Sequence, residues 1–423
     1  MAAAMQAPFA AFERIPPPGK PGMLNDIWET PGVLKRMLKE HLQAAEGRVS
    51  FPRLEKPLPE SHAFAGRSAL QVMADVASGG FKNKITVLGC GTSWHAALFA
   101  EYVIESIARI PVDVQYASEY RHNQPLVRPG DVLIVISSSG ETYDTVDCLR
   151  TVQRCEHGRQ VLTLGFVNES DSTIARESDA YVEALAGEEV GVAATKVFSS
   201  TLVALLLLAV ALGAETGNFP EADRMELLAK LQELPGQVQE VLDHESRPLR
   251  QEARERSIAI GECMLWDMSC QNVLANNFIF LGRGFNFPIA LEGAMKCKEI
   301  AYIHAEGYPA AEMKHGPIAL IDQFMPVVFI APRSDPTYGK IKANIEEVKA
   351  RSGSTVAITE EYNTELEELC EYVIRVPPTH EYLMPILSVI PLQLLAYMMG
   401  ILRGNEVDAP RGLQKQISFA GAS

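Results

Sequence analysis

A short hydroxyl-rich segment, Ser137-Ser138-Ser139-Gly140-Glu141-Thr142, directly follows an apolar, β-branched run. Serine and threonine hydroxyls can donate hydrogen bonds to phosphate oxygens, and Gly140 lets the backbone approach a ligand closely. A helix that begins after this segment would add free backbone N–H groups and the positive end of its dipole. The segment therefore predicts a phosphate site that needs no lysine. A second interpretation stays open, because serine followed three residues later by glutamate is also the pattern of a helix capping box.

A second turn of similar composition, Gly89-Cys90-Gly91-Thr92-Ser93, follows another apolar run. A dinucleotide fingerprint would need a third glycine at residue 94, where this chain has tryptophan. The turn therefore does not predict a nucleotide cofactor, and we expect none. Cys90 is interpreted as a small packing residue rather than a nucleophile.

The composition excludes several classes of protein. A net charge of −15 argues against nucleic-acid binding, which needs clustered positive charge. The seven cysteines never form a CxxC pair, so we expect free thiols in the cytoplasm and no metal site. The N-terminus lacks the pattern of a secretory signal. The apolar run Val197–Gly213 is nearly long enough to span a bilayer, but we expect a helix buried on all sides and no membrane association.

The chain contains an internal repeat. Gly89 and Gly282 each end an apolar run that leads into a G-x-G turn and a helical stretch, and they lie 193 residues apart. Glu119 and Glu312 keep the same offset. Later apolar strands and a long apolar helix also recur in both copies. The expected strands are 85–88, 132–136, 161–165, 279–281, 327–330 and 355–358, and the expected helices are 93–108, 198–212, 288–303 and 383–402.

Strands that alternate with helices predict parallel sheets covered by helices on both faces. The expected fold class is therefore α/β, with two tandem doubly wound, flavodoxin-like domains. A helix at 222–243 is expected to join them, and another is expected to lead the chain at 23–45. The expected segments are a tail and leading helix (1–49), the first domain (50–215), a helical linker (216–244), the second domain (245–402) and a C-terminal tail (403–423) outside both cores. Ligand motifs should lie at the carboxyl ends of the strands.

These motifs together resemble the sugar isomerase (SIS) domains, and most closely the double-SIS half of the glutamine–fructose-6-phosphate amidotransferase family. The resemblance runs from about residue 23 to the C-terminus. It is carried by Gly89–Ser93, Ser137–Thr142, Gly191-Val192-Ala193-Ala194-Thr195-Lys196, residues 281–322 and residues 407–415.

The resemblance implies a function and a set of site residues. That family converts fructose 6-phosphate to glucosamine 6-phosphate with ammonia from a glutaminase domain. By resemblance, Lys415 would form a Schiff base with the sugar C2 carbonyl, Glu299 would move a proton between C1 and C2 beside Lys296, and His315 would open the ring. The residues that would bind the substrate are Thr92, Ser93, Ser137, Ser138, Ser139, Thr142 and Val192.

Each catalytic residue has a plainer interpretation when it is taken alone. Lys296 and Glu299 are three residues apart on one helix face, a spacing that usually makes a surface ion pair. His315 precedes Gly-Pro and could be a turn residue, and a lysine in a C-terminal tail is ordinarily solvated. Only their joint occurrence in the order of the family supports the catalytic interpretation.

The chain also departs from the family pattern. No segment resembling the glutaminase domain precedes the first SIS copy, and no cysteine occurs before Cys90. The sequence therefore predicts no glutamine hydrolysis, and it predicts nitrogen supplied as free ammonia or by a separate glutaminase subunit. Ser138 stands where the family usually has glutamine, and Ala194 where it usually has serine, so the preferred sugar could differ.

Several functions remain open at this stage. The leading one is isomerisation with amine transfer on a hexose 6-phosphate, and the alternatives are deamination of an amino sugar phosphate in the reverse direction, isomerisation without nitrogen, and a non-catalytic sugar-phosphate sensor. The resemblance implies at least a homodimer, because the His315 position serves the site of a neighbouring subunit in the family.

Overall fold

A five-stranded parallel sheet lies in the first half of the computed structural model, which describes Ile15 and residues 19–78, 82–123, 125–250 and 263–414. The spatial order of its strands is β4-β3-β5-β6-β7, and every neighbouring pair is parallel. The strands are β3 (Ile85–Gly89), β4 (Val112–Tyr116), β5 (Val132–Ser137), β6 (Leu162–Val167) and β7 (Ala180–Glu183).

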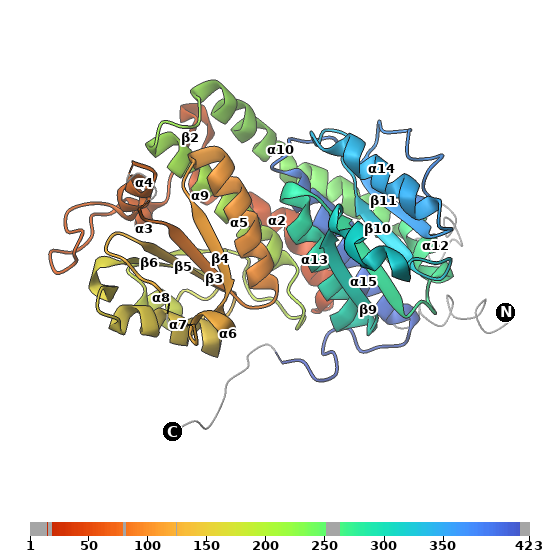
Figure 1. The fold of residues 1–423 in the computed structure, drawn as a ribbon, viewed down its shortest axis with the longest axis horizontal. Coiled ribbons are helices and arrows are strands. Elements are labelled where there is room, and N and C mark those ends of the chain that lie inside the picture. Colours follow the sequence, from red (N-terminus) through yellow and green to blue (C-terminus); the bar gives the residue numbers. More distant parts are fainter. Residues whose placement is uncertain (1–14, 16–18, 79–81, 124, 251–262, 415–423) are drawn as a thin grey trace. The chain divides into compact units, whose positions relative to one another are not determined.

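Helices cover both faces of this first sheet (Figure 1). On one face, α5 (Thr92–Ala108) contacts β3, β4 and β5. On the other, α7 (Tyr143–Arg154) buries Val146, Leu149 and Val152 in a core shared with Leu133 and Val135 of β5. The central strands are buried on both sides, which explains why their sequences are continuously apolar rather than alternating.

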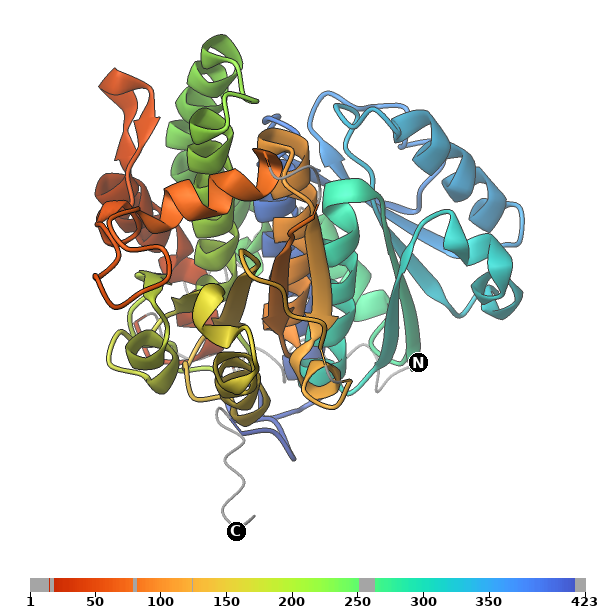
Figure 2. The same ribbon diagram turned by 60° about the vertical axis from the view of Figure 1, so that its left-hand side comes forward.

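A second five-stranded parallel sheet has the equivalent order, β12-β11-β10-β8-β9. Its strands are β8 (Asn277–Gly282), β9 (His304–Pro309), β10 (Pro326–Ile330), β11 (Ser354–Glu360) and β12 (Tyr372–Val376). Helix α13 (Phe287–Lys296) lies along one face, and α14 (Tyr338–Lys349) lies along the other (Figure 2). The α/β fold class of two doubly wound domains is therefore confirmed.

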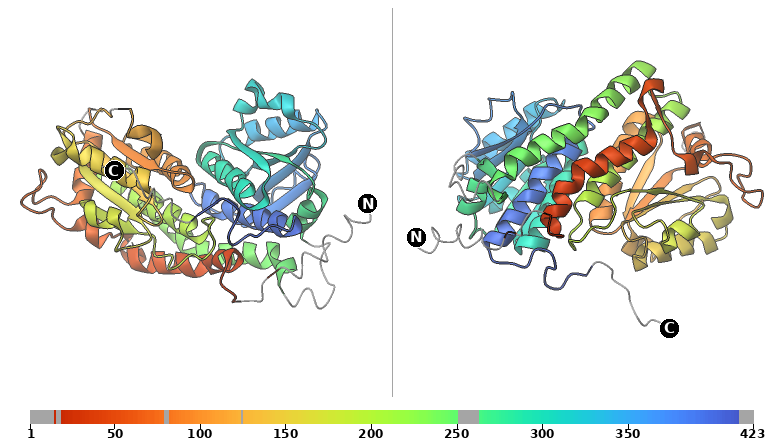
Figure 3. Two further views of the ribbon diagram at one scale, coloured as in Figure 1. Left: turned by 90° about the horizontal axis from the view of Figure 1, so that it is seen from below. Right: turned by 180° about the vertical axis from the view of Figure 1, so that it is seen from behind.

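The chain divides into two compact units, each built around one sheet. The first-copy unit contains residues 32–187 and 197–232. The second-copy unit contains the described residues up to Pro31, the segment 188–196 and residues 233–413. Two helices, α2 (Met23–His41) and α10 (Glu221–Glu245), each continue from one unit into the other (Figure 3).

Within the described part of the chain, two helices are apolar and long enough to cross a membrane, but both are buried in the protein. They are α9 (Lys196–Glu215), with 94% of its most apolar window buried, and α15 (Met384–Leu402), with 100%. The expectation of a buried helix at Val197–Gly213 is confirmed. Helix α15 packs against α12 (Met264–Gln271), α13 and β12 within the second-copy unit.

Three expectations, two about helices and one about the C-terminal segment, need correction. The leading helix ends at His41 rather than near residue 45, because Leu42–Gln43 (β1) turns back and pairs with Arg48–Val49 (β2). The helix expected at 288–303 changes at Cys297 into a π-helix that ends at Ala301. The C-terminal segment is not wholly outside the cores, since Val407 is only 7% exposed.

The remaining elements are short or lie before the first sheet. They are the helices α3 (Pro52–Glu55), α4 (Ala69–Ser78), α6 (Ala117–Tyr120) and α8 (Thr173–Glu177), and 3₁₀ turns at 44–46, 158–160, 247–249, 284–286, 312–315 and 317–320.

Candidate functional site

The hydroxyl-rich loop of the first copy forms a closed turn at the carboxyl end of β5. Ser137 Oγ lies 2.9 Å from Thr142 Oγ1 and accepts a hydrogen bond from the Gly140 backbone N–H at 3.1 Å. Ser139 Oγ accepts from the Glu141 N–H at 3.2 Å. Ser137 is buried, whereas Ser138, Ser139 and Thr142 are half-buried and therefore partly accessible to a ligand.

Helix α7 begins directly after this loop, at Tyr143. The side chain of Thr142, at the N-cap position, makes no capping hydrogen bond, since its hydroxyl is turned to Ser137. Glu141 precedes the helix, and its carboxylate accepts a hydrogen bond from the Thr173 N–H at 2.6 Å. The capping-box interpretation of Ser138 and Glu141 is therefore wrong, and the positive end of α7 faces the loop without a capping side chain.

No residue other than glycine fits at position 140. Its φ is +64°, a conformation that side chains other than glycine rarely adopt, and a Cβ there would lie 2.0 Å from Ser172 Oγ. The glycine lets the loop turn tightly beside the start of α8.

The second predicted turn lies next to the first. Strands β3 and β5 are adjacent. From β3 the chain continues to β4 on one side, and from β5 it continues to β6 on the other side. The place between β3 and β5 is therefore the topological switch point, where ligands bind in such sheets. Thr92 and Ser93, both half-buried, begin α5 at this edge. Burial, with a smaller contribution from Asp144, raises the pKa of the Cys90 thiol, which agrees with a packing role for Cys90.

Three charged side chains meet in the second copy. Lys296 Nζ lies 2.5 Å from Glu299 Oε2 and 3.2 Å from Glu292 Oε1. The side chains of Lys296 and Glu292 are 0% exposed, whereas that of Glu299 is 17% exposed. Glu299 is therefore the one member of this triad that a substrate could touch.

The position of Glu299 depends on the change of helix type. Glu299 lies in the π-helical segment Cys297–Ala301, a form of backbone that is frequent at functional sites. The segment ends at Tyr302, which has a left-handed conformation with φ 53° and ψ 39°.

Lys296 is held as an ammonium ion. Burial alone would lower its pKa, but the carboxylates of Glu292 and Glu299 outweigh that effect and raise the pKa above its ordinary value. A lysine that stays protonated at neutral pH is not a nucleophile. The geometry suits Lys296 to orienting Glu299 and balancing its charge.

The triad does not lie at the carboxyl ends of the strands, where ligand motifs were expected. Helix α13 starts after the carboxyl end of β8 and runs back along the sheet. Beyond its π-helical end the chain enters β9, whose first residue, His304, pairs with Asn277, the first residue of β8. Lys296 and Glu299 are thus at the amino edge of the second sheet, and the expectation of carboxyl-end motifs is wrong for them.

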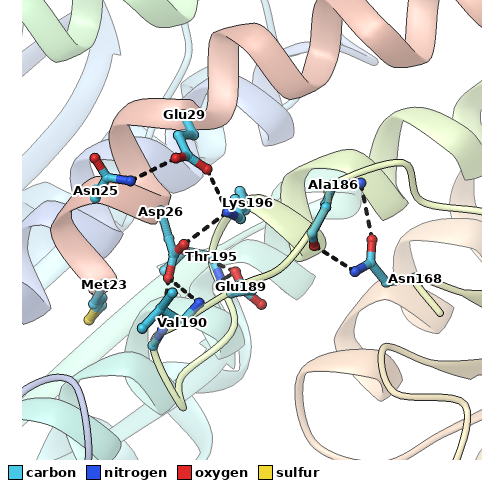
Figure 4. Close-up of polar contacts among 12 residues, drawn as sticks. Met23, Asn25, Asp26, Glu29, Asn168, Ala186, Glu189, Val190, Thr195 and Lys196 are labelled. Carbon is cyan, nitrogen blue, oxygen red and sulfur yellow. Dashed lines mark hydrogen bonds and ion pairs between the residues drawn. The ribbon is translucent and has the colours of Figure 1, made fainter. Parts of the chain in front are cut away.

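Buried Asp26 and Lys196 hold the loop that contains Val192, and Figure 4 shows these two side chains beside Val190. Asp26 Oδ2, on α2, accepts hydrogen bonds from the backbone N–H groups of Val190 and Gly191 at 2.9 and 2.8 Å. Lys196 Nζ lies 2.9 Å from Asp26 Oδ1 and 2.6 Å from Glu29 Oε2. All of these residues belong to the second-copy unit, and Val192 itself is half-buried.

His315, one of the two remaining predicted residues, is not joined to the triad. His315 is exposed at the end of a 3₁₀ turn, and its side chain has no hydrogen bond or ion pair among the described residues. Lys415 lies outside the described residues.

Comparison with known proteins identifies the family of the two sheets. The SIS domain model matches two segments of the chain, residues 81–211 and 274–403, which contain the two sheets. The chain belongs to the SIS domain family.

The relatives of this SIS chain include longer proteins. It is 44% identical over 397 residues to a glutamine–fructose-6-phosphate aminotransferase (isomerizing) of Chlorobaculum tepidum, and the match covers 94% of this chain and 58% of that protein. A Thermus thermophilus protein of the same name is 40% identical over 396 residues, with the same coverage. The chain thus spans a little over half the length of the curated relatives it matches.

Solved structures agree with this placement. The C-terminal domain of glucosamine-fructose-6-phosphate aminotransferase from Francisella tularensis has a TM-score of 0.77 and 31% identity, and the match covers 93% of this chain and 99% of that one. A glucosamine-6-phosphate deaminase from Thermotoga maritima has a TM-score of 0.66 at 20% identity, which shows a shared fold.

The second SIS copy has a counterpart of the phosphate loop, but an internal anion fills it. Between β10 and α14, the backbone N–H groups of Arg333 and Ser334 donate to the Glu360 carboxylate at 2.5 and 2.9 Å, and Ser334 Oγ donates at 2.6 Å. Glu360 is 0% exposed. This loop is therefore not a candidate ligand site, although it occupies the place of Ser137–Thr142 in the repeat.

Sequence reasoning about the SIS motifs missed several residues of the site. Glu292 could have been found from its spacing of four residues before Lys296. Asp26 could not, because it reaches Val190 across a sequence separation of 164 residues. The sequence motifs likewise indicated no role for Tyr302 or Asp408.

Proposed function

We propose that this chain catalyses isomerisation with amine transfer on a hexose 6-phosphate, of the fructose 6-phosphate to glucosamine 6-phosphate type. The observation that carries the proposal is the triad of Glu292, Lys296 and Glu299, in which one partly exposed carboxylate is fixed by a buried ammonium ion. Relatives named glutamine–fructose-6-phosphate aminotransferase (isomerizing) support the reaction and the substrate.

Each predicted side chain has a role in the proposed reaction. The loop Ser137–Thr142 binds the phosphate together with Thr92 and Ser93, and Val192 lines the sugar pocket. His315 moves a proton as the ring opens. The Lys415 amine forms an imine at C2 with loss of water, and ammonia from solution or from a separate glutaminase replaces it. Glu299 removes a proton from C1 and returns it to C2, a transfer suited to a positioned carboxylate.

The decisive test is turnover by the purified chain. Incubation with fructose 6-phosphate and ammonium chloride should yield glucosamine 6-phosphate by NMR, and incubation with glucosamine 6-phosphate shows whether the reverse deamination occurs. Sugar phosphate bound without turnover in either direction would support the sensor instead. Isomerised sugar without nitrogen would leave a plain isomerase.

Lys415→Ala should abolish imine trapping. Borohydride reduction with fructose 6-phosphate should add the mass of the reduced sugar phosphate to the wild-type chain and leave the variant unmodified, because the nucleophilic amine is gone. Lys298→Ala, which removes an exposed lysine, is the matched control and should trap normally. Trapping that survives in Lys415→Ala would contradict the assignment.

Location and assembly are part of the proposal. All seven cysteines are free, in agreement with a reducing compartment such as the cytoplasm. An exposed His315 without an intrachain partner among the described residues fits a residue that serves a neighbouring subunit, so we expect a homodimer. A fully active monomer in light scattering would contradict this.

A further inference from the structure

The segment that precedes Lys415 is fixed to the second-copy unit at several points. The Asn405 side-chain amide donates to the Ile300 carbonyl at 2.8 Å, and Val407 is buried. Asp408 Oδ1 accepts the backbone N–H of Met23, the first residue of α2, at 2.8 Å. The Asp408 carbonyl accepts the Val192 N–H at 3.1 Å. One residue thus connects α2, the Val192 loop and the tail.

The next anchor is Tyr302, which follows Glu299 by three residues. Its hydroxyl accepts the backbone N–H of Arg411 at 2.8 Å, and the Arg411 guanidinium lies over its ring, 4.3 Å from the centroid. The left-handed backbone of Tyr302 is uncommon for a residue other than glycine and is typical of functional sites. This conformation ends the helix that carries Glu299 and leaves the Tyr302 ring in contact with the tail.

The residues around Asp408 are also closely packed. A Cβ on Gly22 would lie 2.7 Å from both carboxylate oxygens of Asp408, so only glycine lets this carboxylate approach the start of α2. Beyond Arg411 the chain turns at Gly412, whose φ is +76°.

We propose that Tyr302 and Asp408 are positioning residues that fix the described part of the C-terminal tail and so hold Glu299 and Val192 in place for the reaction. The inference rests on the proposed function. Tyr302 ties the tail to the helix end that carries Glu299, and Asp408 ties it to the loop that carries Val192. The tail and the two parts of the proposed sugar site that lie in the second-copy unit thus share one rigid support.

Two variants remove the anchors with little effect on the core. Tyr302→Phe deletes one hydroxyl, and Asp408→Ala deletes the acceptor of the Met23 N–H. Asp408→Asn keeps an oxygen acceptor at that place and serves as the conservative rescue. Matched controls are Tyr308→Phe on β9 and Asp322→Ala, which removes an exposed acceptor of a backbone N–H at the same 2.8 Å.

The kinetic readout is the turnover of fructose 6-phosphate with ammonia. Tyr302→Phe and Asp408→Ala should lower kcat by about tenfold or more and change KM by less than about twofold, since misplaced catalytic groups affect chemistry more than phosphate binding. Asp408→Asn should stay within about threefold of the wild type. Both controls should keep wild-type constants.

A second readout needs no turnover. Trypsin should release the peptide after Arg411 at least about fivefold faster from Tyr302→Phe and Asp408→Ala than from Asp408→Asn, as expected when local anchoring is lost. Unchanged kcat in both anchor variants, or an Asp408→Asn variant as impaired as Asp408→Ala, would overturn the inference. A wild-type chain without turnover would refute the proposed function instead, and proteolysis would still show whether the two residues anchor the tail.

Discussion

Glu299→Gln should abolish most of the turnover of fructose 6-phosphate while leaving the protein folded and able to bind the sugar phosphate. Glutamine keeps the length of the side chain and can still accept a hydrogen bond from Lys296, but it cannot take up and return a proton. Loss of a general acid–base group typically lowers kcat by about 10²- to 10⁴-fold. The Lys296 ammonium keeps its contact with Glu292 at 3.2 Å, so we expect little unfolding.

The measurement separates binding from chemistry. Sugar-phosphate affinity should stay within about threefold of the wild type by calorimetry, since the proposed phosphate contacts come from hydroxyls and backbone N–H groups of other residues. Exchange of the C1 proton with deuterium from the solvent, followed by NMR, should disappear in the variant. Glu306→Gln makes the same change at a 42% exposed side chain on β9 and should keep normal exchange. Normal exchange in Glu299→Gln would remove this residue from the mechanism.

Lys296→Met should cause the largest loss of stability. The variant removes the Lys296 ammonium that lies 3.2 Å from the buried Glu292 carboxylate, and removal of one partner of a buried ion pair typically costs about 3–5 kcal/mol. Urea unfolding should show this as a lower midpoint with an unchanged slope. Lys298→Met, two residues along the same helix, loses only an exposed pair at 3.7 Å and should change stability by less than about 0.5 kcal/mol.

The pH dependence of Lys296→Met gives a further check. In the wild type the raised pKa of Lys296 means that its stabilising contribution is present at every pH below the ordinary lysine value and is lost only as pH rises through the raised value. It therefore does not vary between pH 5 and pH 9. In the variant, protonation of the buried carboxyl group at low pH removes the buried charge that Lys296 no longer balances, so the deficit should shrink from pH 7 to about pH 4.5. A deficit that is constant over that range would contradict the role of charge.

Much of the fold could be predicted because local patterns decide it. Six of the ten strands in the two sheets are short apolar runs that were located to within two residues, whereas the four edge strands, β4, β7, β9 and β12, were not predicted. The linker helix, expected at 222–243, is found at 221–245 despite Pro235. These elements depend on neighbouring residues and on burial, both of which can be recognised in a single sequence.

The site was less predictable because its contacts join distant residues. Nothing in the order of residues around Glu299 indicates a π-helix rather than an α-helix. The pair Asp26 and Lys196 lies 170 positions apart in the chain. Asp408 and Met23 are separated by 385 residues. Residue types could identify Lys296 and Glu299 as a pair, but only the fold shows that Glu292 completes it and that Glu299 alone of the three reaches the surface.

The carboxylate of Glu360 has a consequence for how the two halves divide their work. The two copies have sheets of equivalent strand order, and a loop follows the central strand of each. An acidic side chain that satisfies the amide and hydroxyl donors of one loop repels an incoming phosphate through its own charge. This loop of the second copy is therefore closed to a phosphate, although other residues of the second-copy unit contact the sugar in the proposed reaction. We expect one phosphorylated ligand per polypeptide, a ratio that the protein sets with one of its own side chains.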